Sequence, residues 1–386
     1  MKSLDMLKCL KNKNVFLRCD FNIPLRNNQI SDTFKINHSL KTIEYLIKLK
    51  PKKIILASHL GRPIGYDKEL TLKPIANYLN DKLGQTIYHG NNINNNNSIM
   101  LLENLRFNNG EEDNNNKFAK FLANLSDIYI NDAFAVSHRK HASVSKILDY
   151  FPDNNKYMGF LFEMERNTLD RLINDKKKPF VVILGGSKIT DKIKLVDNLL
   201  IHADTILIGG ALSYCFLKAK GFNVGDSPYS ENDVVIAKKI LKSDINNKIV
   251  LRCDSIVSDQ NENIFQTHDE NIPTKFQGYD IGNNTIYLFS QYIKTAKKIF
   301  WNGPLGMYEK DKFQKGSKEI IKILTKMDKC DIIIGGGETG DMIHKMNLTN
   351  SSNIQILTGG GASLNYLGGA SLNYLGTNNL LYINKY

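Results

Sequence analysis

The hydrophobic positions of this chain form short apolar runs that alternate with stretches of helical periodicity. In the first part of the chain, strand-like runs occupy 15–19, 54–58, 99–102 and 127–130, and helical patterns cover about 35–49, 71–83 and 117–125. Strands that alternate with helices are typical of βαβ units and parallel sheets. The pattern therefore predicts an α/β fold with doubly wound, Rossmann-like parallel sheets.

The second half repeats this pattern, and there each apolar run leads into glycines. The runs VVIL, ILI, IFW, III and IQILT are followed by GGSK (185–188), GGA (209–211), NGP (302–304), GGGET (335–339) and GGG (359–361). Ligands of open α/β sheets bind at the carboxyl ends of the strands. Glycines there let backbone N–H groups approach a phosphate chain. We therefore expect a nucleotide site in this half.

In the first half, arginines occupy the positions after the strands. Arg18, Arg62, Arg106 and Arg139 lie in these segments, although only 8 of the 51 basic residues are arginine. A planar guanidinium that binds two oxygens cannot be replaced by an ammonium group. Surface ion pairing is the alternative for any one of them. Together they indicate a site for a small substrate with several negative charges.

The length and the apolar pattern predict two domains joined by a helix. A chain of 386 residues can form two cores. We expect a first domain over 1–155 together with a C-terminal tail from about 363 to 386. A long amphipathic helix over 156–175 would lead into a second domain over 176–362.

The composition and charge of the chain limit the classes of partner that it is expected to bind. The net charge of +12 comes from lysines scattered among asparagines and isoleucines, which gives no basic helix for nucleic acid. No apolar run reaches the ~18 residues of a membrane span, and no signal peptide is evident. The five cysteines share no metal-ligand spacing. We expect a cytoplasmic monomer that binds neither nucleic acid nor membrane.

Several motifs carry candidate binding groups. RCDFNIPL contributes Asp20 and Asn22, SHLGRP contributes His59 and Arg62, and LLENLRF and NDAFAVSHRKHAS contribute Arg106 and Arg139. Converging arginines with a histidine suit a phosphorylated carboxylic acid. In the last motif, Asp132, His138 and His141 are expected to be structural. Lys188 and Lys192 follow GGS at helical spacing and are placed to put positive charge near a phosphate chain; solvated lysines are the alternative.

Taken in order, eight motifs resemble the phosphoglycerate kinase family. They are RCDFNIPL, SHLGRP, ENLRF, NDAF with SHR, GGSKITDK, WNGPLGMYE, GGGET and TGGGAS. The resemblance implies two doubly wound domains joined by a long helix and hinge, with the tail returning to the first domain. It also implies reversible phosphoryl transfer in glycolysis between 1,3-bisphosphoglycerate and MgADP, which gives 3-phosphoglycerate and MgATP after the domains close. Because the acceptor is a carboxylate ionised at pH 7, no general base is required.

The resemblance also assigns roles to residues. Implied substrate ligands are Asp20, Asn22, Lys35, His59, Leu60, Gly61, Arg62, Arg106 and Arg139. Implied nucleotide ligands are Gly186, Lys188, Lys192, Gly210, Asn302, Pro304, Glu309, Gly336, Gly337, Glu338 and Thr339. Lys35, Lys188 and Lys192 would be catalytic, and Mg²⁺ would be held by Glu338 and Asp191.

Four features depart from the family. Lys35 aligns with a bridging arginine, Glu338 replaces an aspartate that binds magnesium, and Ala211 replaces the third glycine of a GGG run. The segment GASLNYLG occurs at 361–368 and again at 369–376. We expect the second copy to be looped out. We expect these departures to affect the catalytic turnover more than the fold.

Two other functions stay open at this point. GGGETG (335–340) matches the dinucleotide-binding pattern of an NAD-dependent oxidoreductase, although no acidic residue follows at the expected distance. A non-catalytic binding protein with the kinase fold is the other alternative. A Walker A motif is absent from the sequence, which argues against an ordinary P-loop enzyme.

Overall fold

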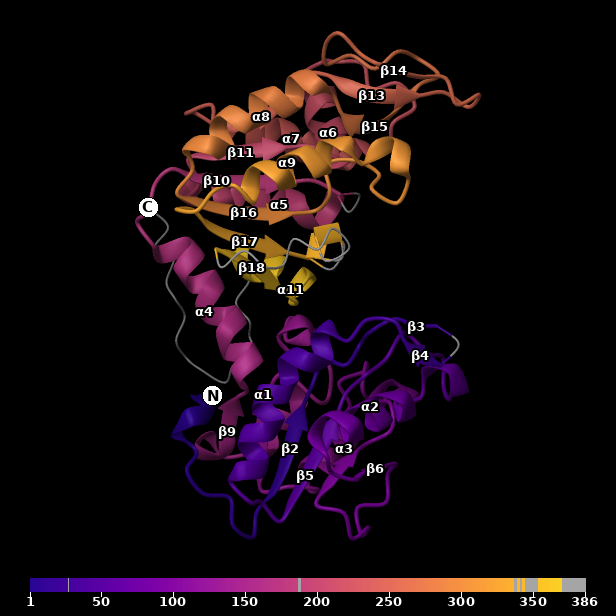
Figure 1. Ribbon diagram of the computed structural model, residues 1–386, viewed down its shortest axis with the longest axis vertical. Coiled ribbons are helices and arrows are strands. Elements are labelled where there is room, and N and C mark those ends of the chain that lie inside the picture. The colour runs from indigo at the N-terminus through magenta and orange to yellow at the C-terminus, as the bar shows by residue number, and fades with distance from the viewer. Residues whose placement is uncertain (27, 187–188, 337–338, 341, 344–352, 370–386) are drawn as a thin grey trace. The chain divides into compact units, whose positions relative to one another are not determined.

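The chain divides into two compact units, and each is described by itself. The computed structural model describes residues 1–369 except 27, 187–188, 337–338, 341 and 344–352 (Figure 1). The first unit covers Met1–Thr168 and the second begins at Leu169. The division falls within α4 (Phe160–Asn174), which matches the long amphipathic helix expected from the sequence.

The first unit contains a seven-stranded parallel sheet with the order β1-β9-β8-β2-β5-β7-β6. Its strands are β1 (Lys2–Ser3), β2 (Asn14–Arg18), β5 (Lys53–Ala57), β6 (Ile87–His89), β7 (Ile99–Leu101), β8 (Ile128–Asn131) and β9 (Lys156–Met158). The helices are α1 (Phe34–Lys48), α2 (Lys73–Leu83) and α3 (Asn116–Ala123). A small hairpin, β3 (Leu25–Arg26) and β4 (Gln29–Ile30), follows β2.

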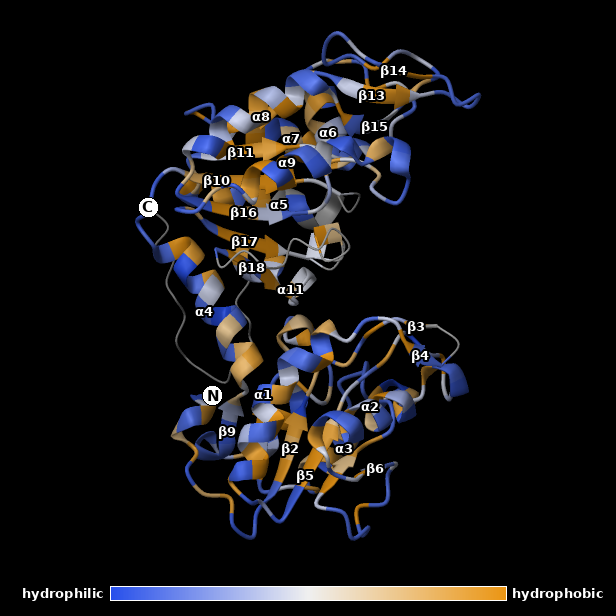
Figure 2. Ribbon diagram, viewed as in Figure 1, coloured by the Kyte–Doolittle hydropathy of each residue, from blue (hydrophilic) through white to orange (hydrophobic). Residues whose placement is uncertain are grey.

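The alternation of side chains along β2 explains why helices cover both faces of this sheet. Val15 and Leu17 belong to the core packed under α1 and α2, whereas Phe16 belongs to the core packed under α3. Successive side chains of a strand point to opposite faces, so an entirely apolar strand requires cover on both. Figure 2 shows the strands as the most hydrophobic elements, between helices with polar outer faces.

The second unit contains a six-stranded parallel sheet with the order β12-β11-β10-β16-β17-β18. Its strands are β10 (Phe180–Leu184), β11 (Thr205–Ile208), β12 (Ile249–Leu251), β16 (Lys298–Asn302), β17 (Asp331–Gly335) and β18 (Ile354–Leu357). The helices are α5 (Ile189–His202), α6 (Leu212–Ala219), α7 (Glu231–Ser243), α8 (Asn283–Thr295), α9 (Lys315–Leu324) and α11 (Gly361–Leu367).

The strand order explains the placement of these helices. From β10 the chain moves outward through β11 to β12, and from β16 it moves outward in the opposite direction to β17 and β18. Right-handed crossovers then put α5–α7 on one face and α8–α9 on the other. Phe289 of α8 and Ile320 of α9 pack on Ile183 and Trp301 of the sheet, as this requires.

A smaller antiparallel sheet follows β12. It has the order β14-β13-β15, with β13 (Ser255–Ser258), β14 (Ile264–Gln266) and β15 (Gln277–Ile281). The sequence pattern did not predict this sheet. The two doubly wound parallel sheets that it did predict are confirmed. No helix of the described part is long and apolar enough to cross a membrane.

The end of the described chain packs in the second unit. Helix α11, which contains most of the first GASLNYLG copy, lies against α5, and Asn198 Nδ2 donates a hydrogen bond to Leu367 O at 2.6 Å. Leu367 and Ala362 are fully buried. The second copy, from Ala370 on, and the rest of the tail lie outside the described residues.

Candidate functional site

In the first unit, the loops that follow β2 and β5 are bonded to each other. Asn22 Oδ1 accepts a hydrogen bond from Gly61 N at 2.9 Å, and Ser58 Oγ accepts one from Phe21 N at 2.9 Å. Asp20 Oδ1 in turn accepts from Asn22 N at 3.3 Å. Adjacent parallel strands end at one edge of the sheet, so four of the predicted substrate residues (Asp20, Asn22, His59 and Gly61) lie in two joined loops.

Lys35, in the first turn of α1, forms an ion pair in this region. Its Nζ lies 2.9 Å from Asp20 Oδ2, and only 26% of its side chain is exposed. Burial acts to lower the pKa of Lys35, but the negative charge and hydrogen bond of Asp20 outweigh it, and the pKa is raised. Lys35 therefore remains charged, with one carboxylate already beside it.

His59 is a neutral imidazole at physiological pH. Burial, followed by the positive charges of Arg18, Arg106 and Lys35, lowers its pKa well below the usual value. Its Nδ1 lies 3.4 Å from Arg18 Nη2, which can only donate. The proton of the ring is therefore assigned to Nε2, and His59 can serve a ligand as a hydrogen-bond donor rather than as a charge.

Arg18 has a structural role, although its position at the end of β2 had suggested a ligand. It is fully buried, and its Nε donates to Ser143 Oγ at 2.7 Å while Nη1 donates to Cys19 O at 2.5 Å. Glu111 Oε1 lies 3.7 Å from Nη2. These contacts pin the end of β2 and supply positive charge to His59.

Arg106 is a buried arginine of the first unit with a guanidinium nitrogen that lacks a hydrogen-bond partner in the described part of the chain. Its Nη1 donates to Gly61 O at 2.5 Å, and its Nε lies 3.0 Å from Glu112 Oε1. Its Nη2 is buried and has no hydrogen-bond partner among the described residues. A buried N–H group without a partner is costly, and an oxygen of an anionic ligand would satisfy it.

The other predicted substrate residues surround this cluster. The positive charge of Arg139 contributes to lowering the pKa of Arg106, after burial, which places the two guanidiniums near each other. Arg62 is exposed. Leu60 is buried, and its N donates to Asn104 Oδ1 at 3.2 Å. Asn104 Oδ1 also accepts a hydrogen bond from Arg106 N, so Asn104 positions both loops. Asn104 belongs to the LLENLRF motif, but this role was not predicted from the sequence.

The acidic and histidine residues of the NDAFAVSHRKHAS motif are mainly structural. Asp132 is fully buried and caps α4, because its Oδ1 accepts from Leu161 N at 2.9 Å and from Phe162 N at 3.3 Å. Burial raises the pKa of Asp132 to about 7. Burial and the neighbouring arginines lower the pKa of His141 to about 3, so this ring is neutral. His138 is half-buried.

In the second unit, backbone bonds join the loops that follow three adjacent strands. Pro304 O, after β16, accepts from Gly186 N at 2.6 Å, and Leu305 O accepts from Gly210 N at 3.1 Å. Gly186 has φ +77°, and a Cβ added to Gly210 would lie 2.6 Å from Gly186 N. Only glycine allows this close packing. Four predicted nucleotide residues (Gly186, Gly210, Asn302 and Pro304) are therefore in one place.

Lys192, on the first turns of α5, reaches back to the ends of β10 and β16. Its Nζ donates to Gly185 O at 2.5 Å, and the residue is buried. Cβ atoms added to Gly186 and Gly303 would lie 2.8 and 2.5 Å from this Nζ. The two glycines thus make room for the ammonium group at the centre of the sheet edge.

Asn302 and Thr339 connect the ends of β16 and β17. Asn302 Nδ2 donates to Gly335 O at 2.7 Å, and Thr339 Oγ1 accepts from Gly303 N at 2.8 Å. Gly336 follows directly, and a Cβ there would lie 2.8 Å from Asn302 Nδ2. Glu309 is exposed beyond this loop. Ala211, the N-cap residue of α6, has φ −66°, so its side chain causes no backbone strain.

Some predicted residues cannot be placed. Lys188, Gly337 and Glu338 lie outside the described residues, as does the side chain of Asp191. Within the described part, no three His, Cys, Asp or Glu residues form a cluster that could hold a metal.

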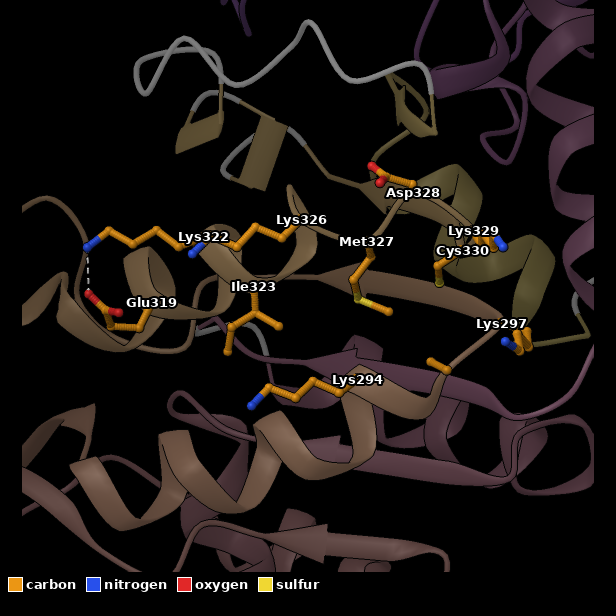
Figure 3. Close-up of a pocket in the computed structure, with 11 residues that line it drawn as sticks. Lys294, Lys297, Glu319, Lys322, Ile323, Lys326, Met327, Asp328, Lys329 and Cys330 are labelled. Carbon is orange, nitrogen blue, oxygen red and sulfur yellow. Dashed lines mark hydrogen bonds and ion pairs between the residues drawn. The ribbon is translucent and has the colours of Figure 1, made fainter.

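A pocket of about 650 Å³ lies elsewhere in the second unit, beside the beginnings of β16 and β17 (Figure 3). Its lining combines Lys294, Lys326 and Met327 with Glu319, which pairs with Lys322 at 2.8 Å. It is at the opposite edge of the sheet from the glycine loops, so it is not part of the candidate site. Nothing in the described part shows what would occupy it.

Comparisons with known proteins agree with this arrangement. A model of the phosphoglycerate kinase family matches residues 4–370. The chain belongs to the phosphoglycerate kinase family. Two relatives, both named phosphoglycerate kinase, come from Borreliella burgdorferi (38% identical, covering 95% of this chain and 96% of the relative) and Thermosipho africanus (40% identical, covering 93% of each).

Solved structures of phosphoglycerate kinases have the same fold. The enzyme from Coxiella burnetii is similar with a TM-score of 0.83 and 32% identity, over 96% of this chain and 97% of that one. The enzyme from Pyrococcus horikoshii has a TM-score of 0.82 and 30% identity, over 97% and 98%. Family membership supports a kinase and gives no support to the oxidoreductase alternative.

Proposed function

We propose that this chain catalyses reversible phosphoryl transfer between 1,3-bisphosphoglycerate and ADP, giving 3-phosphoglycerate and ATP. Family membership carries the proposal. Its chemistry is supported by two different strand-end clusters in one chain, one with arginines and a neutral histidine and one with glycines and a buried lysine. The substrate is an acidic metabolite and the acceptor atom is a carboxylate oxygen.

In the first unit, the glycerate substrate would bind at the loops after β2, β5 and β7. The unpartnered Nη2 of Arg106 would receive an oxygen of the anion. Arg62 and Arg139 would add charge, and His59 and Asn22 would contact the uncharged part. Lys35 would leave its single ion pair with Asp20 to meet the transferring group. A leading role for positioning and charge is expected for phosphoryl transfer.

In the second unit, the phosphate chain of the nucleotide would lie on the glycine loops. Gly186, Gly210, Gly336 and Gly337 would admit it, and Lys192 with Lys188 would stabilise the charge that develops on the transferring phosphoryl. Asn302, Pro304, Glu309 and Thr339 would contact the rest of the nucleotide. Asp191 and Glu338 would hold Mg²⁺, which neutralises phosphate charge when bound. Because the substrates bind to different domains, we propose that the domains close before transfer.

No side chain is required to move a proton. The attacking or leaving group is a carboxylate with a pKa near ~4. The neutral states of His59 and His141 agree with this, since neither ring is held ready as an acid at pH 7. We further propose a cytoplasmic monomer whose small-molecule partners are these substrates alone.

A coupled assay tests the proposal. With 3-phosphoglycerate and MgATP, phosphorylation that depends on both substrates is expected, and calorimetry with NAD should detect no binding. Absence of turnover with retained binding of 3-phosphoglycerate and ADP would favour the non-catalytic binding protein. Micromolar NAD binding without kinase turnover would contradict the proposed function.

A further inference from the structure

A buried carboxylate outside the predicted site touches the loop that follows β16. Asp280, near the end of β15, is 1% exposed. Its Oδ1 accepts a hydrogen bond from Ile281 N and its Oδ2 accepts one from Gly316 N, both at 2.8 Å. Cβ atoms added to Gly306 and Gly316 would lie 2.2 and 2.4 Å from Oδ1. The carboxylate therefore fills the space between β15, the start of α9 and the loop after β16.

That loop contains two of the predicted nucleotide residues, Asn302 and Pro304, and contacts two others. On one side, Pro304 O and Leu305 O accept from Gly186 N and Gly210 N. On the other side, Met307 N donates to Tyr279 O at 2.8 Å and Leu305 N donates to Ser317 Oγ at 2.9 Å. The loop is thus held between the glycine loops and the segment that Asp280 organises.

From these contacts we infer that Asp280 is a positioning residue for nucleotide binding. Its ionised carboxylate accepts from two backbone N–H groups and fixes the loop 302–307 against the glycine loops, without touching the nucleotide itself. The inference rests on the proposed function, because it takes this loop to be part of the nucleotide site.

Burial brings the ionisation of Asp280 into the neutral pH range. Burial raises its pKa to about 7, and the positive charges of Arg252 and Lys315 act against this. Arg252 is itself buried, with its guanidinium 4.4 Å from the ring centre of Tyr214, and Tyr214 Oη donates to Gly278 O on β15. A protonated carboxyl group is uncharged, so it accepts more weakly from the two N–H groups, and it carries an O–H donor of its own. Nucleotide affinity should therefore improve as the pH rises through neutrality.

The test compares Asp280→Asn with a matched control, Asp254→Asn. Asp254 is equally buried, and its carboxylate caps α8 by accepting from Thr285 N at 2.8 Å and Asn284 N at 2.9 Å; among the described residues it makes no hydrogen bond to the loop 302–307. Both variants lose a buried charge and gain an NH₂ group that faces a backbone N–H. We would measure KM for ATP and for 3-phosphoglycerate, the dissociation constant of ADP by calorimetry, and Tm.

Asp280→Asn should raise KM for ATP and the dissociation constant of ADP roughly 10-fold at pH 8, the size of one lost charge-assisted hydrogen bond. KM for 3-phosphoglycerate should change less than about twofold. The ratio of variant to wild-type KM should approach one at pH 6, where the wild-type carboxyl is protonated; this ratio cancels the titration of the nucleotide itself. Asp254→Asn should lower Tm without separating the two KM values.

Two results would overturn the inference. One is an Asp280→Asn variant that only loses stability, or raises both KM values equally, as the control would. The other is a KM ratio that does not change between pH 6 and pH 8. If the wild-type chain shows no phosphoryl transfer, the proposed function fails, but the ADP dissociation constants still decide the role of Asp280.

Discussion

At the scale of single residues, the departure at Lys35 has the most direct consequence. Its Nζ lies 2.9 Å from Asp20 Oδ2, which shows that the side chain reaches the predicted substrate loops. A compact ammonium supplies charge but cannot hold two oxygens in one plane, as a guanidinium can. The loss of one charge-assisted hydrogen bond, worth ~1.5–3 kcal/mol, corresponds to roughly 10-fold to over 100-fold in rate.

We therefore predict that Lys35→Arg raises kcat/KM for 3-phosphoglycerate, measured in the coupled assay. The same substitution at the exposed Lys176 should have no effect. If Lys35→Arg is neutral or harmful while Lys35→Ala is nearly inactive, the pocket has adapted to lysine. If both variants are neutral, Lys35 is not the residue that bridges the substrates.

A second prediction concerns Lys192, whose ammonium group is buried beside Gly185 and Gly303. Lys192→Ala should lower kcat by roughly 10² or more, because it removes charge that stabilises the transferring phosphoryl. Lys188→Ala should act in the same direction. Lys318→Ala, at an exposed position of α9, is the control, and Tm should show that the variants are folded. Near-normal kcat in both Lys192→Ala and Lys188→Ala would remove these residues from the mechanism.

At the scale of elements, the apolar runs predicted the strands well because a buried parallel strand must be apolar on both faces. The runs 54–58 and 181–184 correspond to β5 and β10, and α4 begins four residues after the start of the predicted helix and ends one residue before its predicted end. The small sheet of β13–β15 was missed, since β14 has only three residues and its two apolar side chains are exposed, which leaves too short a pattern to indicate a strand. Such strands are defined by their partners rather than by their own residues.

Residues of the candidate site were predictable from the sequence only where a residue type suited to ligand binding follows an apolar strand. Glycine loops and strand-end arginines can be read from the sequence, and Gly186, Pro304 and Gly210 do lie together. The structural role of Arg18 could not be predicted from the sequence, because its partners Ser143 and Glu111 come from distant segments of the chain. Asp280 was missed for the same reason, since its partner Gly316 is 36 residues away.

The duplicated segment gives a prediction about α11. The first GASLNYLG copy forms α11, and Tyr366 Oη also donates to Asp170 Oδ1. Since this copy already fills its place against α5, deletion of 369–376 should leave or improve kinase activity and yield soluble protein. Long surface insertions cost little closure entropy, only ~0.6 kcal/mol per doubling of length. Loss of soluble protein after the deletion would contradict this prediction. As a control, Leu367→Ala, which removes a buried side chain of the first copy, should lower Tm.

At the scale of the whole molecule, buried titratable groups determine how stability changes with pH. The pKa values of Asp132 and Asp280 are raised by burial to about 7. The native chain therefore binds more protons at these groups than the unfolded chain does, from about pH 4 to pH 7. Their contribution to stability is fully present below about pH 4 and is lost as the pH rises through 7.

The buried histidines act in the opposite direction, in a lower window. Burial lowers the pKa of His59 well below its usual value and that of His141 to about 3, so below about pH 6.5 the unfolded chain binds more protons at these two groups. From about pH 4 to 6.5 the two histidines offset the two aspartates. Above about pH 6.5, of these four groups mainly the aspartates still titrate, and their titration should make the free energy of unfolding fall towards pH 8. The N-terminal amine of Met1, whose pKa is lowered by burial, acts against this fall.

We therefore predict a lower Tm at pH 8 than at pH 6.5, measured by differential scanning calorimetry at constant ionic strength. Asp132→Asn keeps an acceptor oxygen for the cap of α4 but cannot ionise, so it should reduce the difference between the two Tm values, and the double variant with Asp280→Asn should nearly abolish it. A Tm that is equal or higher at pH 8 in the wild-type chain would contradict the prediction. Because the loop that Asp280 positions is expected to bind nucleotide best when Asp280 is ionised, the condition that favours this role is the one in which the burial of Asp280 costs the most stability.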